Sequence, residues 1–489
     1  MSPFYILLIT GLYFAFLLLI SFLTGKDDSN AAFFKAKNKS RWYVVSFGMI
    51  GASLSGVTFI SVPGWVGSAQ FSYLQVVLGY VLGYILITFV LLPLYYRMNF
   101  TSIYEYLKQR FGMVSYRTGA LFFIISRLLG ISFQLFLVAS VLQYFVFDFW
   151  HIPFVLTVSI SVLFIWLYTA RAGINTIIWT DVLQTFCMLL ALGLAVVLIV
   201  NELDWGIQDV FLSKELRAYT QVFFTEDVFN RNYFWKAFFG GAFITIGMTG
   251  LDQDMMQKNL TCRNLKEAKK NMLSYGIAFI PINIIFLLLG ALLFTYAHEI
   301  GMDIPERTDF LFPEIALRGS LGIGLGIIFL LGLIAATFSS ADSGMAALTT
   351  SFCIDFLTID KYTEERQKRL RKRVHLGVGL MLIITIVTFN YFLDSNIIDL
   401  LLTAATYTYG PLLGLFSFGL LTRRRVKDTY VIYLAVFSAG FTFAVNQLPA
   451  RYLWGYEFNY ELLFLNGLLM FLGLWAISSK KARGALTRE

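Results

Sequence analysis

Residues 48–58 read GMIGASLSGVT, and Pro63 and Gly64 follow within the same apolar segment. Glycine, small hydroxyl residues and proline all weaken a continuous helix, so the segment predicts a helix that is interrupted near its middle. Residues 240–250 read GGAFITIGMTG and show the same weakness. Interrupted helices in matching positions of the two halves of a chain mark the binding sites of membrane transporters. The alternative interpretation is that these glycines only let neighbouring helices pack closely.

The composition of the chain predicts a membrane protein. Of its 489 residues, 58% are hydrophobic and 14% are charged, whereas soluble domains carry about 25% charged residues. Apolar runs of about 20 residues, each long enough to cross a bilayer, recur from end to end. We therefore predict an all-α polytopic membrane protein with about thirteen transmembrane helices. Their approximate limits are 4–23, 44–66, 73–96, 116–146, 152–170, 176–200, 235–252, 271–297, 319–353, 375–393, 396–421, 429–447 and 459–478.

The positions of lysine and arginine predict the orientation of the chain. Basic residues accumulate on the cytoplasmic side of membrane proteins, and here most of the 38 fall in alternate loops. We predict a multi-pass protein of the cell membrane (plasma or bacterial inner membrane), with the N-terminus outside and the C-terminus in the cytoplasm. The net charge of +8 then reflects this topology and contacts with lipid headgroups, not binding to nucleic acid. No basic stretch precedes residues 4–23, which we interpret as an uncleaved span.

The sequence lacks the motifs that are typical of several functional classes. The three histidines are scattered and form no metal-ligand pattern. The three cysteines fall in predicted spans or on the cytoplasmic side, where disulfides are rare. No nucleotide-binding loop is present, which disfavours transport driven directly by ATP. We therefore predict neither an enzyme nor an ATP-driven pump.

Polar residues inside two predicted spans suggest a cation site. Asp181 lies near the start of the sixth span, and residues 335–343 of the ninth read AATFSSADS. On a helix, Ser339, Asp342 and Ser343 share one face, and Ala336 and Ser340 lie on the adjoining strip. Carboxylate, hydroxyl and carbonyl oxygens suit a hard cation such as sodium, and carboxylates within a membrane are costly unless they are used. The alternative is that the serines bond to their own helix and Asp342 pairs with a buried arginine.

Several ordered segments resemble the sodium:solute symporters, a family of sodium/glucose, proline, pantothenate, iodide and sialic-acid carriers. The segments are SIYEYLKQRFG (102–112), WTDVLQ (179–184), LDQDMMQK (251–258) with KEAK (266–269), the serine run at 335–343 and YGPLL (409–413). The resemblance implies a LeuT-type core of five plus five inverted-repeat helices over residues 44–421. An extra span and loop precede it at 1–43, and two spans and a tail follow at 422–489. We also predict a protein that functions as a monomer.

The resemblance also implies where sodium ions bind. A first sodium site between the second and ninth spans is implied at the backbone carbonyls and hydroxyls of Gly51, Leu54, Ala336, Ser339 and Ser340. A possible second sodium site is implied at Asp181, Ser339, Asp342 and Ser343. Asp342 departs from the family pattern, which places a hydroxyl residue there. Two neighbouring carboxylates need a positive group between them, such as sodium, a proton or Arg127.

The substrate class is implied less directly. Sugar carriers of the family use a tyrosine and a glutamine where this chain has Met248 and Leu402, which disfavours a plain hexose. Ser55, Thr58 and Arg127 resemble positions that bind sialic acid. Arg127 lies about 18 Å into its span, and a guanidinium there can fork onto a carboxylate. Alternatively, Arg127 pairs with Asp342 or Asp181.

We therefore predict a sodium-coupled symporter that imports a small polar organic solute. A carboxylated substrate such as sialic acid is preferred, and a neutral sugar, polyol, amino acid or vitamin is the alternative. The predicted substrate-binding residues are Ser55, Thr58, Arg127, Thr245 and Met248. A channel would need a continuous polar pore, which isolated polar clusters do not provide. A membrane enzyme would need convergent acid-base groups, for which Asp181 and Asp342 are the only candidates.

Overall fold

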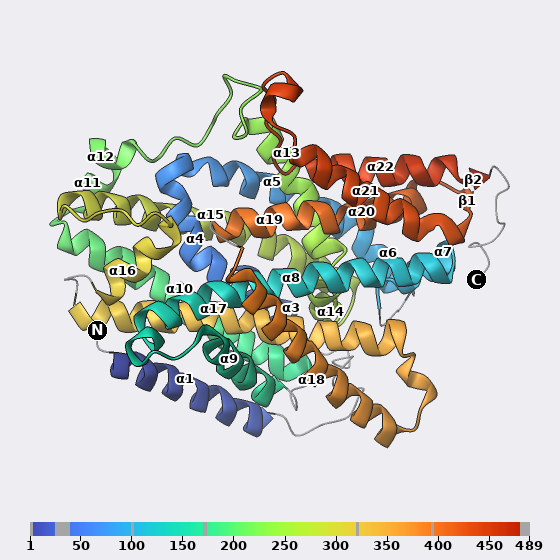
Figure 1. Ribbon diagram of the computed structural model, residues 1–489, viewed down its shortest axis with the longest axis horizontal. Coiled ribbons are helices and arrows are strands. Elements are labelled where there is room, and N and C mark those ends of the chain that lie inside the picture. Colours follow the sequence, from blue (N-terminus) through green and yellow to red (C-terminus); the bar gives the residue numbers. More distant parts are fainter. Residues whose placement is uncertain are drawn as a thin grey trace.

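The computed structural model describes residues 3–24, 40–98, 102–169, 174–318, 322–392 and 396–479, and most of them are helical. Figure 1 shows most of the long helices running along one axis, with α1 at one edge of the molecule and α22 at the opposite edge. The α-helices are α1 (Pro3–Thr24), α3 (Trp42–Ser53), α4 (Gly56–Ala69), α5 (Tyr73–Leu86), α6 (Leu92–Met98), α7 (Glu105–Arg110), α8 (Met113–Phe145), α9 (Phe154–Thr169), α10 (Ile174–Glu202), α11 (Ile207–Leu212), α12 (Lys214–Arg217), α13 (Phe234–Thr245), α14 (Gln253–Asn259), α15 (Leu265–Glu299), α16 (Leu311–Leu317), α17 (Gly322–Ser351), α18 (Glu364–Phe389), α19 (Ile397–Thr408), α20 (Gly410–Leu421), α21 (Val431–Asn446) and α22 (Leu462–Ala476).

Shorter elements extend or link these helices. The π-helical turns are η2 (Ile87–Leu91), η4 (Ile246–Gly250) and η6 (Phe352–Phe356). The 3₁₀ turns are η1 (Gln70–Ser72), η3 (Phe147–Trp150), η5 (Thr308–Phe310), η7 (Ile359–Lys361), η8 (Asp428–Tyr430) and η9 (Ala450–Leu453). Two short strands, β1 (Arg425–Val426) and β2 (Ser478–Ser479), pair antiparallel and join the end of α20 to the end of α22.

The helices confirm the predicted polytopic membrane architecture. Seven helices in the described ranges are long and apolar enough to cross a membrane, or eight if the bent pair of α13 with η4 and α14 forms one span. Six shorter apolar helices, such as α19 and α22, also lie within predicted spans. The count of thirteen spans stays a prediction. Residues 170, 319–321 and 393, at the ends of three predicted spans, lie outside the described residues.

The second predicted span is interrupted, as the sequence predicts. Helix α3 ends at Ser53, and Leu54 (φ −84°, ψ 79°) and Ser55 (φ −76°, ψ 176°) leave helical geometry before α4 begins at Gly56. The last carbonyls of α3 and the first amides of α4 therefore lie at the break without partners in a continuous helix.

The seventh predicted span behaves differently from the prediction. Helix α13 continues through its glycines and widens into the π-turn η4, and the break comes only at Leu251 and Asp252, where α14 turns away by 69°. A methyl group added at Gly241 would lie 2.1 Å from the Val76 carbonyl oxygen, so α13 packs backbone to backbone against α5. Close packing therefore explains Gly241, and the prediction of a break within residues 240–250 was wrong by a few residues.

Helix α17 forms the centre of the molecule. It packs against α10, α8, α4, α3 and α14. Every residue from Gly332 to Ser351 is buried, including the serines and Asp342. Polar side chains on this helix therefore face other helices and must find partners there.

Candidate functional site

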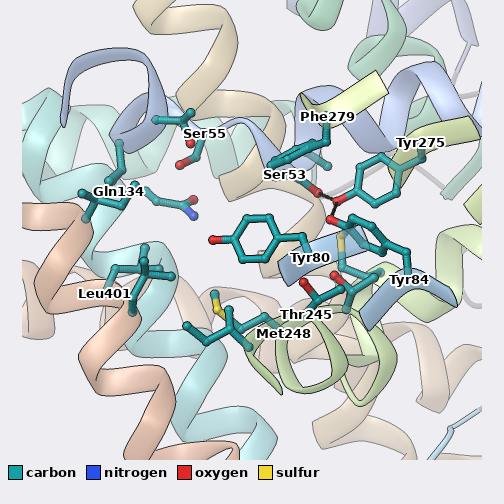
Figure 2. Close-up of a pocket in the computed structure, with 18 of the residues that line it drawn as sticks. Ser53, Ser55, Tyr80, Tyr84, Gln134, Thr245, Met248, Tyr275, Phe279 and Leu401 are labelled. Atoms are coloured by element: carbon teal, nitrogen blue, oxygen red, sulfur yellow. Dashed lines mark hydrogen bonds between the residues drawn. The ribbon is translucent and has the colours of Figure 1, made fainter. Parts of the chain in front are cut away.

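A cavity of about 100 Å³ opens beside the break between α3 and α4. Its walls come from the two interrupted helices together with α5, α8, α15 and α19 (Figure 2). All five residues predicted to bind substrate line it: Ser55, Thr58, Arg127, Thr245 and Met248. Residues more than 190 positions apart in the chain are thus brought to one cavity.

Tyrosine hydroxyls cover one side of the cavity. Tyr84 Oη donates to Tyr275 Oη at 2.9 Å, and Tyr275 Oη lies 2.5 Å from Ser53 Oγ at the end of α3. In Figure 2 the hydroxyl of Tyr80 points into the cavity toward Gln134. Sequence reasoning missed these residues, although Tyr80 and Tyr84 are four positions apart and so share a face of α5.

Part of the cavity wall is apolar. It is formed by Ile398, Leu401 and Leu402 of α19 with Met248 of η4. Leu402 and Met248 are the two positions at which the sequence departs from the sugar carriers, and both lie on the cavity wall. The cavity therefore offers both hydroxyl groups and apolar surface.

Arg127 contributes the positive charge among the cavity-lining residues. It lies in the middle of α8, is 8% exposed, and its Nη2 forms an ion pair with Asp254 Oδ2 of α14. The alternative prediction that Arg127 pairs with Asp342 or Asp181 was therefore wrong, because α14 brings Asp254 closer to the guanidinium. Within the described residues, the buried Nε of Arg127 has no hydrogen-bond partner.

The first sodium site was predicted where α17 meets the end of α3. Ser340 Oγ donates to the carbonyl oxygen of Ala52 at 3.0 Å and to that of Ala336 at 3.4 Å. Gly51 and Leu54 flank Ala52 at the helix end, where carbonyl oxygens lack amide partners. Two carbonyl oxygens thus converge on the Ser340 hydroxyl, and one of them belongs to Ala52, which the predicted set does not include.

The residues of the second predicted site lie beside a buried lysine, Lys258. Ser339 Oγ donates to Asp181 Oδ1 at 2.6 Å, and Lys258 Nζ lies 2.8 Å from Asp181 Oδ2. Lys258 Nζ is also 3.9 Å from Asp254 Oδ1. The side chains of Lys258, Asp181 and Asp254 are at most 1% exposed.

Ser343 and Asp342 complete this buried group. Ser343 Oγ donates to Asp254 Oδ2 at 3.2 Å, and the Ser343 amide donates to Asp342 Oδ1 at 2.5 Å. Sequence reasoning placed Asp254 and Lys258 at the edge of a cytoplasmic loop and so missed them. The available signal was their spacing of four residues beside the interrupted seventh span, which puts both charges on one helix face.

Comparison with known proteins gives one family. The family model of the sodium:solute symporter family matches residues 33–428. The sodium/sialic acid symporter NanT of Aliivibrio fischeri is 25% identical over 426 residues, covering 85% of this chain and 80% of that protein. The sodium/sialic acid symporter SiaT of Proteus mirabilis is 24% identical, with 92% and 89% covered. The human sodium/iodide cotransporter is 25% identical, with 81% and 62% covered.

Two solved structures show the same fold. A sodium-coupled sialic acid symporter in a substrate-bound outward-open state superposes with a TM-score of 0.81 at 19% identity, covering 98% of this chain and 99% of that one. Mhp1, a nucleobase-cation-symport-1 family transporter, gives a TM-score of 0.57 at 15% identity, with 92% and 94% covered. These likenesses confirm the expected LeuT-type helical fold.

Proposed function

The chain belongs to the sodium:solute symporter family, and we propose that it uses the sodium gradient to import a small carboxylated solute of the sialic-acid class. Sodium-coupled symport follows from the family, whereas the substrate class is the proposed part. The observation that carries it is the buried Arg127, which lines the cavity beside the break between α3 and α4. Sialic acid is also the substrate named for two of its relatives.

Two groups in the cavity suit a carboxylate. The Arg127 guanidinium has five donors, and its ion pair with Asp254 engages one nitrogen and orients the plane. Helix α4 begins beside Ser55 without a side-chain cap, which leaves the amides of its first turn available to an anion. The tyrosine hydroxyls in the cavity wall can form hydrogen bonds with the hydroxyl groups of a sugar acid. Met248 and Leu402 can contact its apolar surface.

We further propose that the first sodium ion binds at the carbonyls of Gly51, Leu54 and Ala336 with the hydroxyls of Ser339 and Ser340. The convergence of Ser340 Oγ with the Ala336 and Ala52 carbonyls supports this placement. The ion would bind on the α3 side of the break, and the solute on the α4 side. Each ligand then orders the same two residues, Leu54 and Ser55, which couples the two binding events.

The remaining features of the sequence prediction fit this function. We propose that the N-terminus lies outside and the C-terminus in the cytoplasm, that residues 44–421 form the transport core, and that the protein works as a monomer among membrane lipids. The concentration of basic residues in alternate loops supports the orientation.

Uptake into proteoliposomes tests the proposal. With an inward sodium gradient, we expect radiolabelled N-acetylneuraminate to accumulate above its external concentration, and replacement of sodium by choline to abolish accumulation. Labelled glucose, mannitol, proline and pantothenate test the alternative substrate classes. A channel would not concentrate any of them, and an enzyme would release a changed product.

Two variants assign the carboxylate to Arg127. Arg127→Ala should abolish accumulation of the acid while sodium still raises the thermal stability of the protein. Arg318→Ala is the matched control, because Arg318 is 51% exposed and lies outside the cavity. Sodium-driven uptake of a neutral solute that is unaffected by Arg127→Ala would overturn the carboxylate assignment and leave symport intact.

A further inference from the structure

Lys258 lies where a second cation was expected. Its ammonium is 2.8 Å from Asp181 Oδ2, and the other oxygen of that carboxylate accepts from Ser339 at 2.6 Å. Lys258 Nζ also lies 3.9 Å from Asp254 Oδ1. Both oxygens of the central carboxylate are thus engaged by groups of the protein itself.

The other residues of that cation site are also engaged. Ser343 Oγ donates to Asp254 and to the carbonyl oxygen of Ser339 at 3.1 Å. The Asp342 carboxylate accepts from the Ser343 amide. Asp181, Ser339, Ser343 and one oxygen of Asp342 thus already have a lysine, hydroxyl, amide, carboxylate or carbonyl partner within the protein.

An ammonium group is a reasonable substitute for sodium at this position. Both carry one positive charge, and both bind carboxylate and hydroxyl oxygens at short range. The desolvation of a fully buried ammonium is costly unless it is paired, and Asp181 and Asp254 supply that pairing. The lysine stem reaches the site from α14, so its charge stays with the protein through the transport cycle.

We propose that the Lys258 ammonium is a built-in cation that takes the place of a second sodium ion at Asp181 and Ser339, so that transport is coupled to a single sodium ion. This inference rests on the proposed function, because it assumes that the first sodium site at Ser340 is used. It also gives Lys258 a structural role, since α14, α10 and α17 are held together through its contacts with Asp181 and, through Asp181, with Ser339.

Direct counting of bound sodium tests the inference. The purified full-length protein is equilibrated with ²²Na⁺, and the bound ions are counted per molecule at saturation. We expect one ion for the wild type, one for Asp181→Asn, and strongly weakened binding for Ser340→Ala. We expect a second bound ion in Lys258→Met, because the change exposes the Asp181 carboxylate to sodium, and loss of that ion in the double variant Asp181→Asn/Lys258→Met.

The matched control is Lys236→Met. Lys236 is also a buried lysine, 5% exposed, but it donates to the loop carbonyls of Phe229 and Glu457, away from Asp181. The Lys236→Met variant should still bind one sodium ion. Lys258→Met should in addition require sodium for thermal stability, which Lys236→Met should not.

Three results contradict the inference, and they are distinguishable. Two bound ions in the wild type, with one lost in Asp181→Asn, would show that sodium, and not the Lys258 ammonium, occupies the site at Asp181. One ion in folded Lys258→Met would show that Asp181 does not form a latent site. No bound sodium in the wild type would overturn the proposed function itself. If Lys258→Met does not fold, the numbers of ions bound by the wild type and by Asp181→Asn still decide whether sodium occupies the site at Asp181.

Discussion

Replacement of Asp254 by asparagine should destabilise the protein strongly. The side chain is 1% exposed and is the ion-pair partner of Arg127, which is itself buried in the middle of α8. Removing one partner of a buried pair costs about 3–5 kcal/mol, because the other charge is left without compensation. At 1.4 kcal/mol per factor of ten, the ratio of folded to unfolded protein should fall by roughly 10² to 10³·⁵.

Thiol labelling during heating measures this loss. Cys262 and Cys353 are fully buried and Cys187 is partly buried, so a thiol-reactive dye reports unfolding without an introduced cysteine. Asp254→Asn and Arg127→Met should each lower the midpoint temperature. The double variant should be no less stable than either single variant, because both charges of the pair are removed and Lys258 keeps Asp181 as its partner.

An exposed ion pair provides the control. Glu364 and Lys368 are 68% and 36% exposed and lie 3.6 Å apart, and such pairs contribute little to stability. Glu364→Gln should therefore leave the midpoint unchanged. If Asp254→Asn is as stable as Glu364→Gln, or if the losses of the two single variants simply add in the double variant, the ion pair does not stabilise the fold as argued.

The remaining predictions concern the sodium site and helix packing. Ser340→Ala should raise the sodium concentration for half-maximal uptake by about tenfold, since a lost hydroxyl ligand costs about 1–2 kcal/mol. Ser159→Ala removes an exposed hydroxyl that is hydrogen-bonded to its own helix, and it should leave the sodium concentration for half-maximal uptake unchanged. Gly79→Ala should destabilise the protein by about 1–3 kcal/mol, because the added methyl would lie 1.9 Å from the Phe238 carbonyl oxygen. Gly130→Ala, with no atom within 4 Å, should be neutral in the same thermal assay.

The sequence predicted an interruption within residues 48–64, and the break is found at residues 54–55, because its cause is local. Low helix propensity acts within a few residues, so Ser55 and Gly56 carry the signal themselves. The break after α13 depends instead on a cap and on packing. Asp252 accepts from the amides of Asp254 and Met255 at 2.9 and 3.2 Å and so starts α14, while contact with α5 keeps the glycines of α13 helical.

Isolated and paired charges differ in how well sequence reveals them. Arg127 and Asp181 were found because each is alone in an apolar run. Asp254 and Lys258 lie at the end of such a run, where hydropathy assigns charges to a loop. Their burial depends on partners in other helices, 127 positions away for Arg127, and no local pattern contains that pairing. The five cavity residues were brought together through the family resemblance, not through spacing.

The buried charges and the helix breaks belong to one arrangement around α17. Its Ser340 contacts the end of α3, and its Ser339 and Ser343 contact the group held by α14, so both interrupted helices meet the same buried helix. Residues from both interrupted helices line the cavity, and α4 and η4 contribute to its walls. On the placement proposed above, a sodium ion at Ser340 and a solute at Arg127 would restrict the same hinges from opposite sides. By linkage, the factor by which sodium tightens solute binding must equal the factor by which the solute tightens sodium binding. A carrier built in this way needs only one mobile cation for coupling if the second charge is covalently attached to α14.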